Sequence, residues 1–153
     1  MPLKKLREYL DSNKVKYEIL NHPVAYTAQY VASTAHIPGG ELAKTVIVKC
    51  ASGMKMVVLP ASYEVNFKLL KELIGEKVEL ASEAEFRDLF PDCELGAMPP
   101  FGNLYDMDVY VTKSLSEDEE IAFNACSHTQ LIKLAYTDFE RLVKPKVAKF
   151  STR

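Results

Sequence analysis

Lys44, in the stretch AKTVIVKC at residues 43–50, is a residue whose position suggests a chemical role. The apolar residues of this stretch alternate as in a half-buried β-strand, where successive side chains point to opposite faces. Lys44 then shares a face with two valines and Cys50, whereas Lys49 lies near a turn and can reach water. An ammonium group at position 44 extends to solvent, pairs with an acid, loses its proton, or binds a ligand phosphate or carboxylate.

A second candidate is the loop GAMPPFG, residues 96–102. Its two prolines fix φ and lack N–H donors, while its two glycines allow a close backbone approach. Such a rigid loop can hold peptide N–H groups in a fixed direction, which suits an ester carbonyl or a developing oxyanion. The alternative interpretation is a purely structural turn.

Histidine and cysteine residues lie beside two expected strand ends, in His22-Pro23 and in NACSH at 124–128. A nucleophilic pair of Cys126 with His22 or His36 is open, but no acid stands at a spacing that would orient either histidine. Buried free cysteines are usually inert.

The elements that must position these residues follow from periodicity and turn signals. Thr27 is the expected N-cap of the second helix, and Ser82 and Glu85 form a capping box. Helices are expected over 3–13, 28–36, 65–74, 82–89 and 137–143, strands over 16–20, 43–50, 54–60, 108–112, 120–125 and 130–135, and a loop over 93–103.

This mixture lacks a regular βαβ alternation, so we expect one α+β domain over residues 1–153, built around a mixed sheet. Residues 144–153 form a basic tail, expected to be a solvated end or a supporting phosphate contact. The P-loop, GxGxxG, HExxH and GxSxG patterns are all missing.

Composition narrows the class of protein. Hydrophobic residues make up 48% and charged residues 26%, as in a globular domain, and no apolar run approaches the roughly 18 residues of a membrane span. A net charge of −2 argues against a protein that coats nucleic acid, but allows recognition of a few phosphates at one RNA end. Three cysteines without CxxC spacing, and a charged start that lacks a signal-peptide core, predict a reduced cytoplasmic protein.

The segments AKTVIVK, GAMPPFG and EIAFNACSHTQLIKL, in this order and at these separations, resemble the YbaK/proline-tRNA-synthetase-associated domain family. Its members are aminoacyl-tRNA deacylases, either free-standing or embedded in a synthetase. The resemblance covers nearly the whole chain and implies a YbaK-like fold, with a partly barrel-like mixed sheet and flanking helices. It implies the 3′ acceptor end of aminoacyl-tRNA as partner, with a synthetase as a further candidate, and no metal, cofactor, DNA or membrane.

The resemblance also assigns roles to residues. Lys44 matches the family's essential lysine and Thr45 its usual neighbour, while Gly96 and Pro100 match the G-x-x-x-P loop that faces the aminoacyl ester. Lys44 and Gly96 are therefore the expected catalytic residues. His22 falls near the segment that lines the pocket.

The other implied substrate-binding residues are Met98 and Phe101 as pocket walls, with Asn124, Cys126 and His128 in the segment that closes the pocket. Cys126 departs from the family, because relatives commonly have glycine there. This departure puts a catalytic role of His128 in doubt and makes the wall a candidate for setting specificity.

The implied reaction is hydrolysis of mischarged tRNA in trans. Lys44 would hold the terminal nucleotide through its phosphate or the ester carbonyl, and N–H groups near Gly96 would polarise that carbonyl. The nucleophile would be water, helped by the terminal ribose hydroxyl, or a thiol of the substrate. The pocket favours small amino acids of the Ser/Thr type, with Ala and Cys open.

Two alternatives remain at the level of the sequence. One is a non-catalytic module that binds an aminoacyl group or nucleotide and partners a synthetase. The other is a hydrolase that uses Cys126 or Cys50 as its nucleophile.

Overall fold

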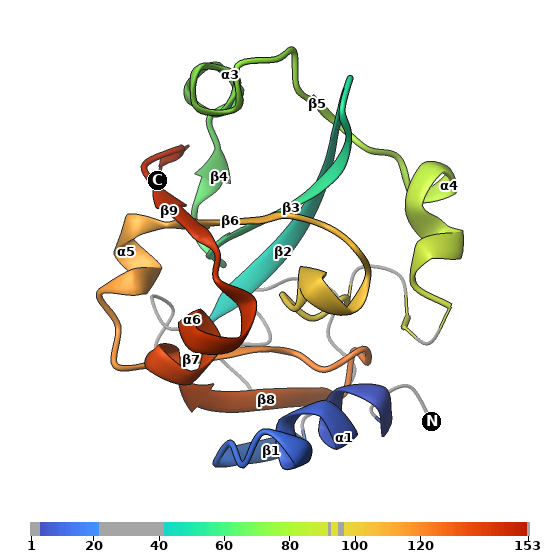
Figure 1. Ribbon diagram of the computed structural model, residues 1–153, viewed down its shortest axis with the longest axis vertical. Helices are drawn as coiled ribbons and strands as arrows, with labels where there is room; N and C mark the ends of the chain where they lie inside the picture. The colour runs from blue at the N-terminus through green and yellow to red at the C-terminus, as the bar shows by residue number, and fades with distance from the viewer. Residues whose placement is uncertain (1–3, 22–41, 92, 95–96, 153) are drawn as a thin grey trace.

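The computed structural model describes residues 4–21, 42–91, 93–94 and 97–152 (Figure 1). Helices and strands alternate irregularly along this part of the chain, as expected for an α+β domain. The helices are α1 (Lys4–Ser12), α3 (Phe67–Ile74), α4 (Glu83–Phe86), α5 (Lys113–Ser116) and α6 (Tyr136–Val143), with 3₁₀ turns η1 (Arg87–Leu89) and η2 (Gly102–Leu104). The strands are β1 (Tyr17–Asn21), β2 (Ala43–Cys50), β3 (Gly53–Pro60), β4 (Glu64–Val65), β5 (Glu79–Leu80), β6 (Val109–Thr112), β7 (Glu120–Asn124), β8 (Gln130–Ala135), β9 (Lys146–Ala148) and β10 (Ser151–Thr152). The helix expected over 28–36 lies outside the described residues.

The predicted hairpin is the centre of the fold. β2 and β3 pair antiparallel from Ala43 opposite Pro60 to Cys50 opposite Gly53, where φ of +123° at Gly53 favours glycine in the turn. The five-stranded sheet has the order β5-β2-β3-β6-β9, and its β3–β6 and β6–β9 pairs are parallel. The mixed sheet expected from the sequence is confirmed.

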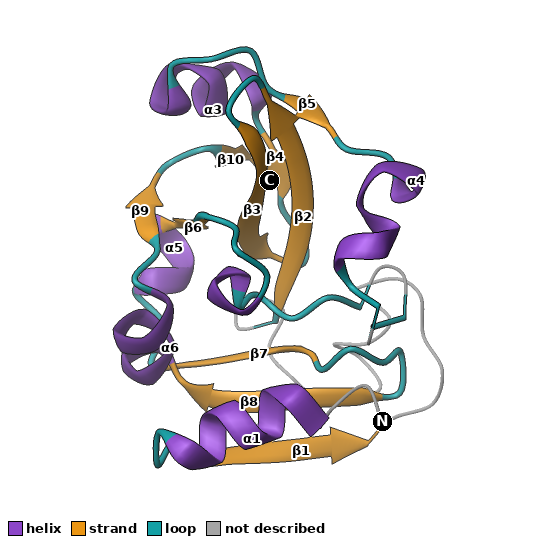
Figure 2. Cartoon of the chain, turned by 45° about the vertical axis from the view of Figure 1, so that its right-hand side comes forward, coloured by secondary structure: helices purple, strands orange, loops and turns teal. Residues whose placement is uncertain are grey.

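A second sheet, with the order β1-β8-β7, runs across the bottom of Figure 2, and β2 rises from it. One parallel bridge, Leu42 with Ala122, joins the start of β2 to β7. The described strands do not close into a barrel. Two separate sheets that meet at this bridge replace the partly barrel-like sheet of the expectation.

Two apolar cores hold the sheets together. The main core lies between them and contains the fully buried rings of Phe101, Phe123 and Phe139. A smaller core covers the other face of the β2–β3 hairpin, where Leu70 of α3 and Phe150 pack on the strands. The hairpin is therefore buried on both faces.

Local signals placed most helix ends correctly. Asn66 caps α3 by accepting a hydrogen bond from the Leu69 N–H, and Gly75 ends the helix with a φ of +84°. Ser82 and Glu85 form the predicted capping box. The helix expected over 82–89 divides, however, into the single turn of α4 and the 3₁₀ turn η1. No described helix could cross a membrane.

The basic tail is not the solvated end that the sequence suggested. β9 pairs with β6 and β10 pairs with β4, although the side chains of Lys146 and Lys149 are exposed. Phe150 between these strands is fully buried in the smaller core. Burial of one aromatic side chain anchors this segment to the sheet.

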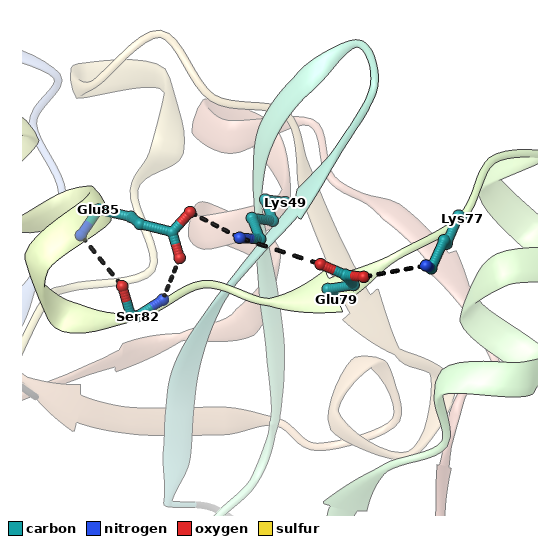
Figure 3. Close-up of polar contacts among 5 residues, drawn as sticks. All are labelled: Lys49, Lys77, Glu79, Ser82 and Glu85. Atoms are coloured by element: carbon teal, nitrogen blue, oxygen red, sulfur yellow. Dashed lines mark hydrogen bonds and ion pairs between the residues drawn. The ribbon is translucent and has the colours of Figure 1, made fainter.

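Lys49, whose side chain is 38% exposed and reaches water as expected, also takes part in a chain of ion pairs (Figure 3). Its Nζ lies 2.7 Å from Glu85 Oε2 and 3.9 Å from Glu79 Oε2, and Lys77 contacts Glu79 at 3.2 Å. The bond to Lys49, and then the backbone N–H of Ser82, lower the pKa of Glu85 to about 2. These contacts connect β2, β5 and the start of α4.

We expect this network to stabilise the fold above the ordinary glutamate pKa of 4.5 and to lose its effect as pH falls toward about 2. The sign follows from the lowered pKa, because the folded protein binds the Glu85 proton less readily than the unfolded chain does. Glu85→Gln retains a capping residue and removes the charge. In urea denaturation the variant should be less stable than the wild type near neutral pH, and the difference should vanish near pH 2. A difference independent of pH would contradict this prediction.

Candidate active site

Lys44 lies at the start of β2, opposite Leu59. Val46, Val48 and Cys50 pack together in the smaller core, which confirms the predicted alternation of faces. Lys44 is half-buried and forms no ion pair with any described residue. Burial lowers the pKa of its ammonium group, and the more distant charge of Glu64 opposes this only in part. Lys44 is thus a half-buried cation without an ion-pair partner among the described residues.

Asn124 ends β7, the strand that the start of β2 meets. The parallel bridge joins Leu42 to Ala122, and Lys44 and Asn124 each stand two residues beyond it along their strands. The Oδ1 atom of Asn124 is buried and accepts no hydrogen bond from the described residues. A buried acceptor without a donor is costly, and a ligand N–H or O–H would satisfy it.

The Gly/Pro loop is attached to the end of β7. The N–H of Glu94 donates to the carbonyl of Cys126 at 3.0 Å, and the N–H of Cys126 donates to the carbonyl of Ala97 at 2.9 Å. The N–H of His128 donates to Glu94 Oε2 at 2.9 Å. Gly96 lies outside the described residues, but its described neighbours on both sides are held against the segment that carries Asn124.

Cys126 occupies a backbone conformation that favours glycine. Its φ is +65°, in the left-handed region, which a glycine adopts without the steric cost of a side chain. Its sulfur is bonded to that of Cys93, and Cys50 is the free cysteine among the described residues. The expectation of three reduced cysteines is wrong for this structure, because folding brings two of them together.

The disulfide also removes Cys126 as a free nucleophile in this form of the protein. His22 and His36, its suggested partners, lie outside the described residues. Cys50 is six residues from Lys44 along β2, which corresponds to about 20 Å. It lies at the hairpin turn, where its sulfur contacts the carbonyl of Gly53.

The apolar residues of the loop pack inward. The Phe101 ring is fully buried, with ring centroids of Tyr9, Phe123 and Phe139 at 6.1, 5.5 and 5.6 Å. Met98 also belongs to the main core. A substrate could reach the Phe101 ring only by displacing these rings. Phe101 therefore anchors the loop in the main core instead of forming a pocket wall.

Pro100 is buried beside Phe101. Thr45 lies on the opposite face of β2 from Lys44, together with Ala43 and Ile47, which are part of the main core. Lys44 and Thr45 therefore do not point into one pocket. Hydrogen bonds hold the loop against Cys126, next to Asn124, and the start of β2 with Lys44 meets β7 at the Leu42–Ala122 bridge. Thr45 faces the main core, and the ring of Phe101 points into that core.

Sequence reasoning did not assign two residues that lie near the site. Glu64, the acid that acts on the pKa of Lys44, comes from β4, and Cys93 contacts the end of β7 from 33 residues away. Neither has a local sequence signal, because only tertiary packing creates these contacts. The described residues contain no cluster of histidine, cysteine and acidic side chains that could hold a metal ion.

Comparison with known proteins decides the family. Residues 22–142 match the model of the aminoacyl-tRNA editing domain, which covers Lys44, the Gly/Pro loop and Asn124. The chain belongs to the aminoacyl-tRNA editing domain family. The resemblance noted from its sequence motifs is confirmed.

Individual relatives of this editing domain agree in fold. The Multifunctional Ser/Thr-tRNA deacylase ProXp-y of Escherichia coli strain K12 is 26% identical over 147 residues, which cover 92% of this chain and 87% of the relative. The crystal structure of a hypothetical protein matches with a TM-score of 0.87 at 22% identity, over 97% of this chain and 99% of the other. A candidate trans-editing enzyme for prolyl tRNA synthetase matches with a TM-score of 0.86 at 17% identity, over 99% and 98%. The two structures share the fold of this editing domain.

Proposed function

We propose that this editing domain is a trans-acting aminoacyl-tRNA deacylase, which hydrolyses the ester of tRNA mischarged with a small amino acid of the Ser/Thr, Ala or Cys type. The observation that carries the proposal is the half-buried Lys44, which pairs with no described residue and stands two residues from the bridge between β2 and β7. Asn124, two residues from the same bridge, has a buried Oδ1 atom that no described residue satisfies. The family and the name of the E. coli relative support the substrate class. The Ser/Thr type is the first candidate.

In the proposed reaction Lys44 neutralises the terminal phosphate or holds the ester carbonyl of the charged tRNA. Peptide N–H groups near Gly96 stabilise the negative charge that develops on the carbonyl oxygen. Water attacks the carbonyl carbon with help from the ribose hydroxyl, or a substrate thiol attacks it. The ester bond then breaks, and the 3′ oxygen of the tRNA takes up a proton.

Asn124 Oδ1, which accepts no hydrogen bond from the described residues, would give the proposed pocket an acceptor for the α-ammonium or side-chain hydroxyl of the amino acid. His22, Cys126, His128 and Pro100 complete the proposed pocket boundary. The partners are then the 3′ acceptor end of aminoacyl-tRNA and, as a further proposal, a synthetase that releases the mischarged product. We propose the cytoplasm, where tRNA is charged, as the place where the protein works.

A deacylation panel tests the function. Purified protein is mixed with tRNA charged separately with Ser, Thr, Ala, Cys and Pro, and ester loss is compared with spontaneous hydrolysis. We expect rapid turnover of one or two small aminoacyl esters and slower loss of the others, since one methylene in an apolar pocket discriminates by about 1–3 kcal/mol, roughly 10–200-fold in rate. Tight binding of charged tRNA without turnover would instead identify a non-catalytic binding module.

A further inference from the structure

Two sulfur atoms meet at the wall of the candidate active site. Cys93 and Cys126 form a disulfide whose Cα atoms are 4.2 Å apart. The hydroxyl of Tyr105 lies 3.6 Å from Cys93 Sγ and 4.0 Å from Cys126 Sγ. Cys126 is only 1% exposed, whereas Cys93 is half-buried. A reagent in solution can therefore approach the Cys93 sulfur more readily than that of Cys126.

The bond joins two parts of the site. Cys93 is at the start of the loop that contains Gly96, and Cys126 follows Asn124 at the end of β7. Apart from the disulfide, the contacts between these parts include the three hydrogen bonds of Glu94, Cys126 and His128 described above. Two of these three hydrogen bonds involve the exposed Glu94, where water competes for them, and the third joins the buried Cys126 and Ala97. The covalent bond is thus the strongest restraint between the loop and β7.

We propose that Cys93 and Cys126 form a reversible thiol–disulfide site that controls the deacylase. In the disulfide form the loop is held in its working position against β7, and reduction releases the loop and slows the reaction. The proposal rests on the proposed function for its kinetic consequence. A disulfide in a cytoplasmic protein is usually transient, catalytic or redox-sensing, which fits this role.

A dithiol can reduce the Cys93–Cys126 bond, and a peroxide can form it again. A dithiol reductant attacks Cys93 Sγ as a thiolate, the S–S bond breaks, and Cys126 leaves as a thiolate that takes up a proton. The second thiol of the reductant then displaces Cys93, so two electrons and two protons pass to the protein. In the reverse direction a peroxide oxidises Cys93 to a sulfenic acid with release of water. Cys126 attacks that sulfur, and a second water leaves.

The experiment compares one protein preparation in two states. Samples are oxidised with hydrogen peroxide or reduced with dithiothreitol, freed of reagent, and checked by intact mass for the loss or gain of two hydrogen atoms. We expect kcat/KM for the preferred aminoacyl-tRNA to fall about tenfold on reduction, as preorganisation of the loop is lost. Cys93→Ala should show the lower rate in both states, with Cys93→Ser as a second variant. Cys50→Ala, the matched control, should respond like the wild type.

A readout independent of activity accompanies the kinetics. Amide hydrogen exchange of residues 97–101 and 124–130 should be faster in the reduced protein and in Cys93→Ala. The proposal is overturned if peroxide forms no Cys93–Cys126 bond, if reduction leaves both rate and exchange unchanged, or if reduction raises the rate. If neither state deacylates any tRNA, the proposed function fails, and unchanged exchange would then overturn the thiol–disulfide site separately.

Discussion

Lys44→Ala should reduce kcat/KM for deacylation by about a hundredfold or more, because positioning and electrostatic stabilisation of the substrate are each worth that much. The free energy of unfolding should change by less than about 1 kcal/mol, since Lys44 is half-buried and pairs with no described residue. Single-turnover deacylation and urea denaturation measure the two quantities. Deacylation that survives the substitution would remove Lys44 from the reaction.

Lys49→Ala provides the matched control for this substitution. Lys49 is on the same strand and the opposite face, and its ammonium group is paired with Glu79 and Glu85. Its removal should leave kcat/KM unchanged. Equal losses for both variants would point to a general effect of positive charge on tRNA binding.

The pH dependence of the rate examines the protonation state of Lys44. Burial lowers its pKa from the ordinary value of 10.5, and Glu64 raises it in part. If the ammonium form acts, kcat/KM corrected for spontaneous hydrolysis falls as pH rises through this lowered pKa. Glu64→Gln removes the raising influence, so the same fall should begin at a lower pH.

Phe101→Ala should destabilise the protein by about 3–5 kcal/mol, the range typical of a buried aromatic side chain replaced by alanine. The ring is fully buried and packs on Phe123 and Phe139, so its loss leaves a cavity in the main core. Urea denaturation followed by circular dichroism measures the change. A loss below about 1 kcal/mol together with altered amino-acid preference would instead support the pocket wall inferred from the sequence.

Leu73→Ala is a suitable comparison for this stability measurement. Leu73 lies on α3 and is 41% exposed, so its truncation removes little buried surface. We expect a change within about 0.5 kcal/mol for that variant. The contrast separates burial in the core from a general sensitivity to loss of apolar side chains.

Residue patterns along the chain predict the parts of the fold that depend on neighbouring residues. Alternation placed the β2–β3 hairpin, and the Ser82–Glu85 spacing marked the start of α4. These signals are local, since strand faces repeat every two residues and a cap acts within one turn. The motifs around Lys44 and Pro100 also indicated the family that comparison then confirmed.

The tertiary structure alone decided which of these residues meet. The Leu42–Ala122 bridge joins the start of the strand with Lys44 to the strand that ends at Asn124, and the Cys93–Cys126 bond crosses 33 residues of chain. Burial of Phe150 anchors the basic tail, residues 144–153, whose charge had indicated a solvated end. Such contacts depend on the packing of the two sheets around the main core, and no short pattern of residue types encodes the distance between segments far apart in sequence.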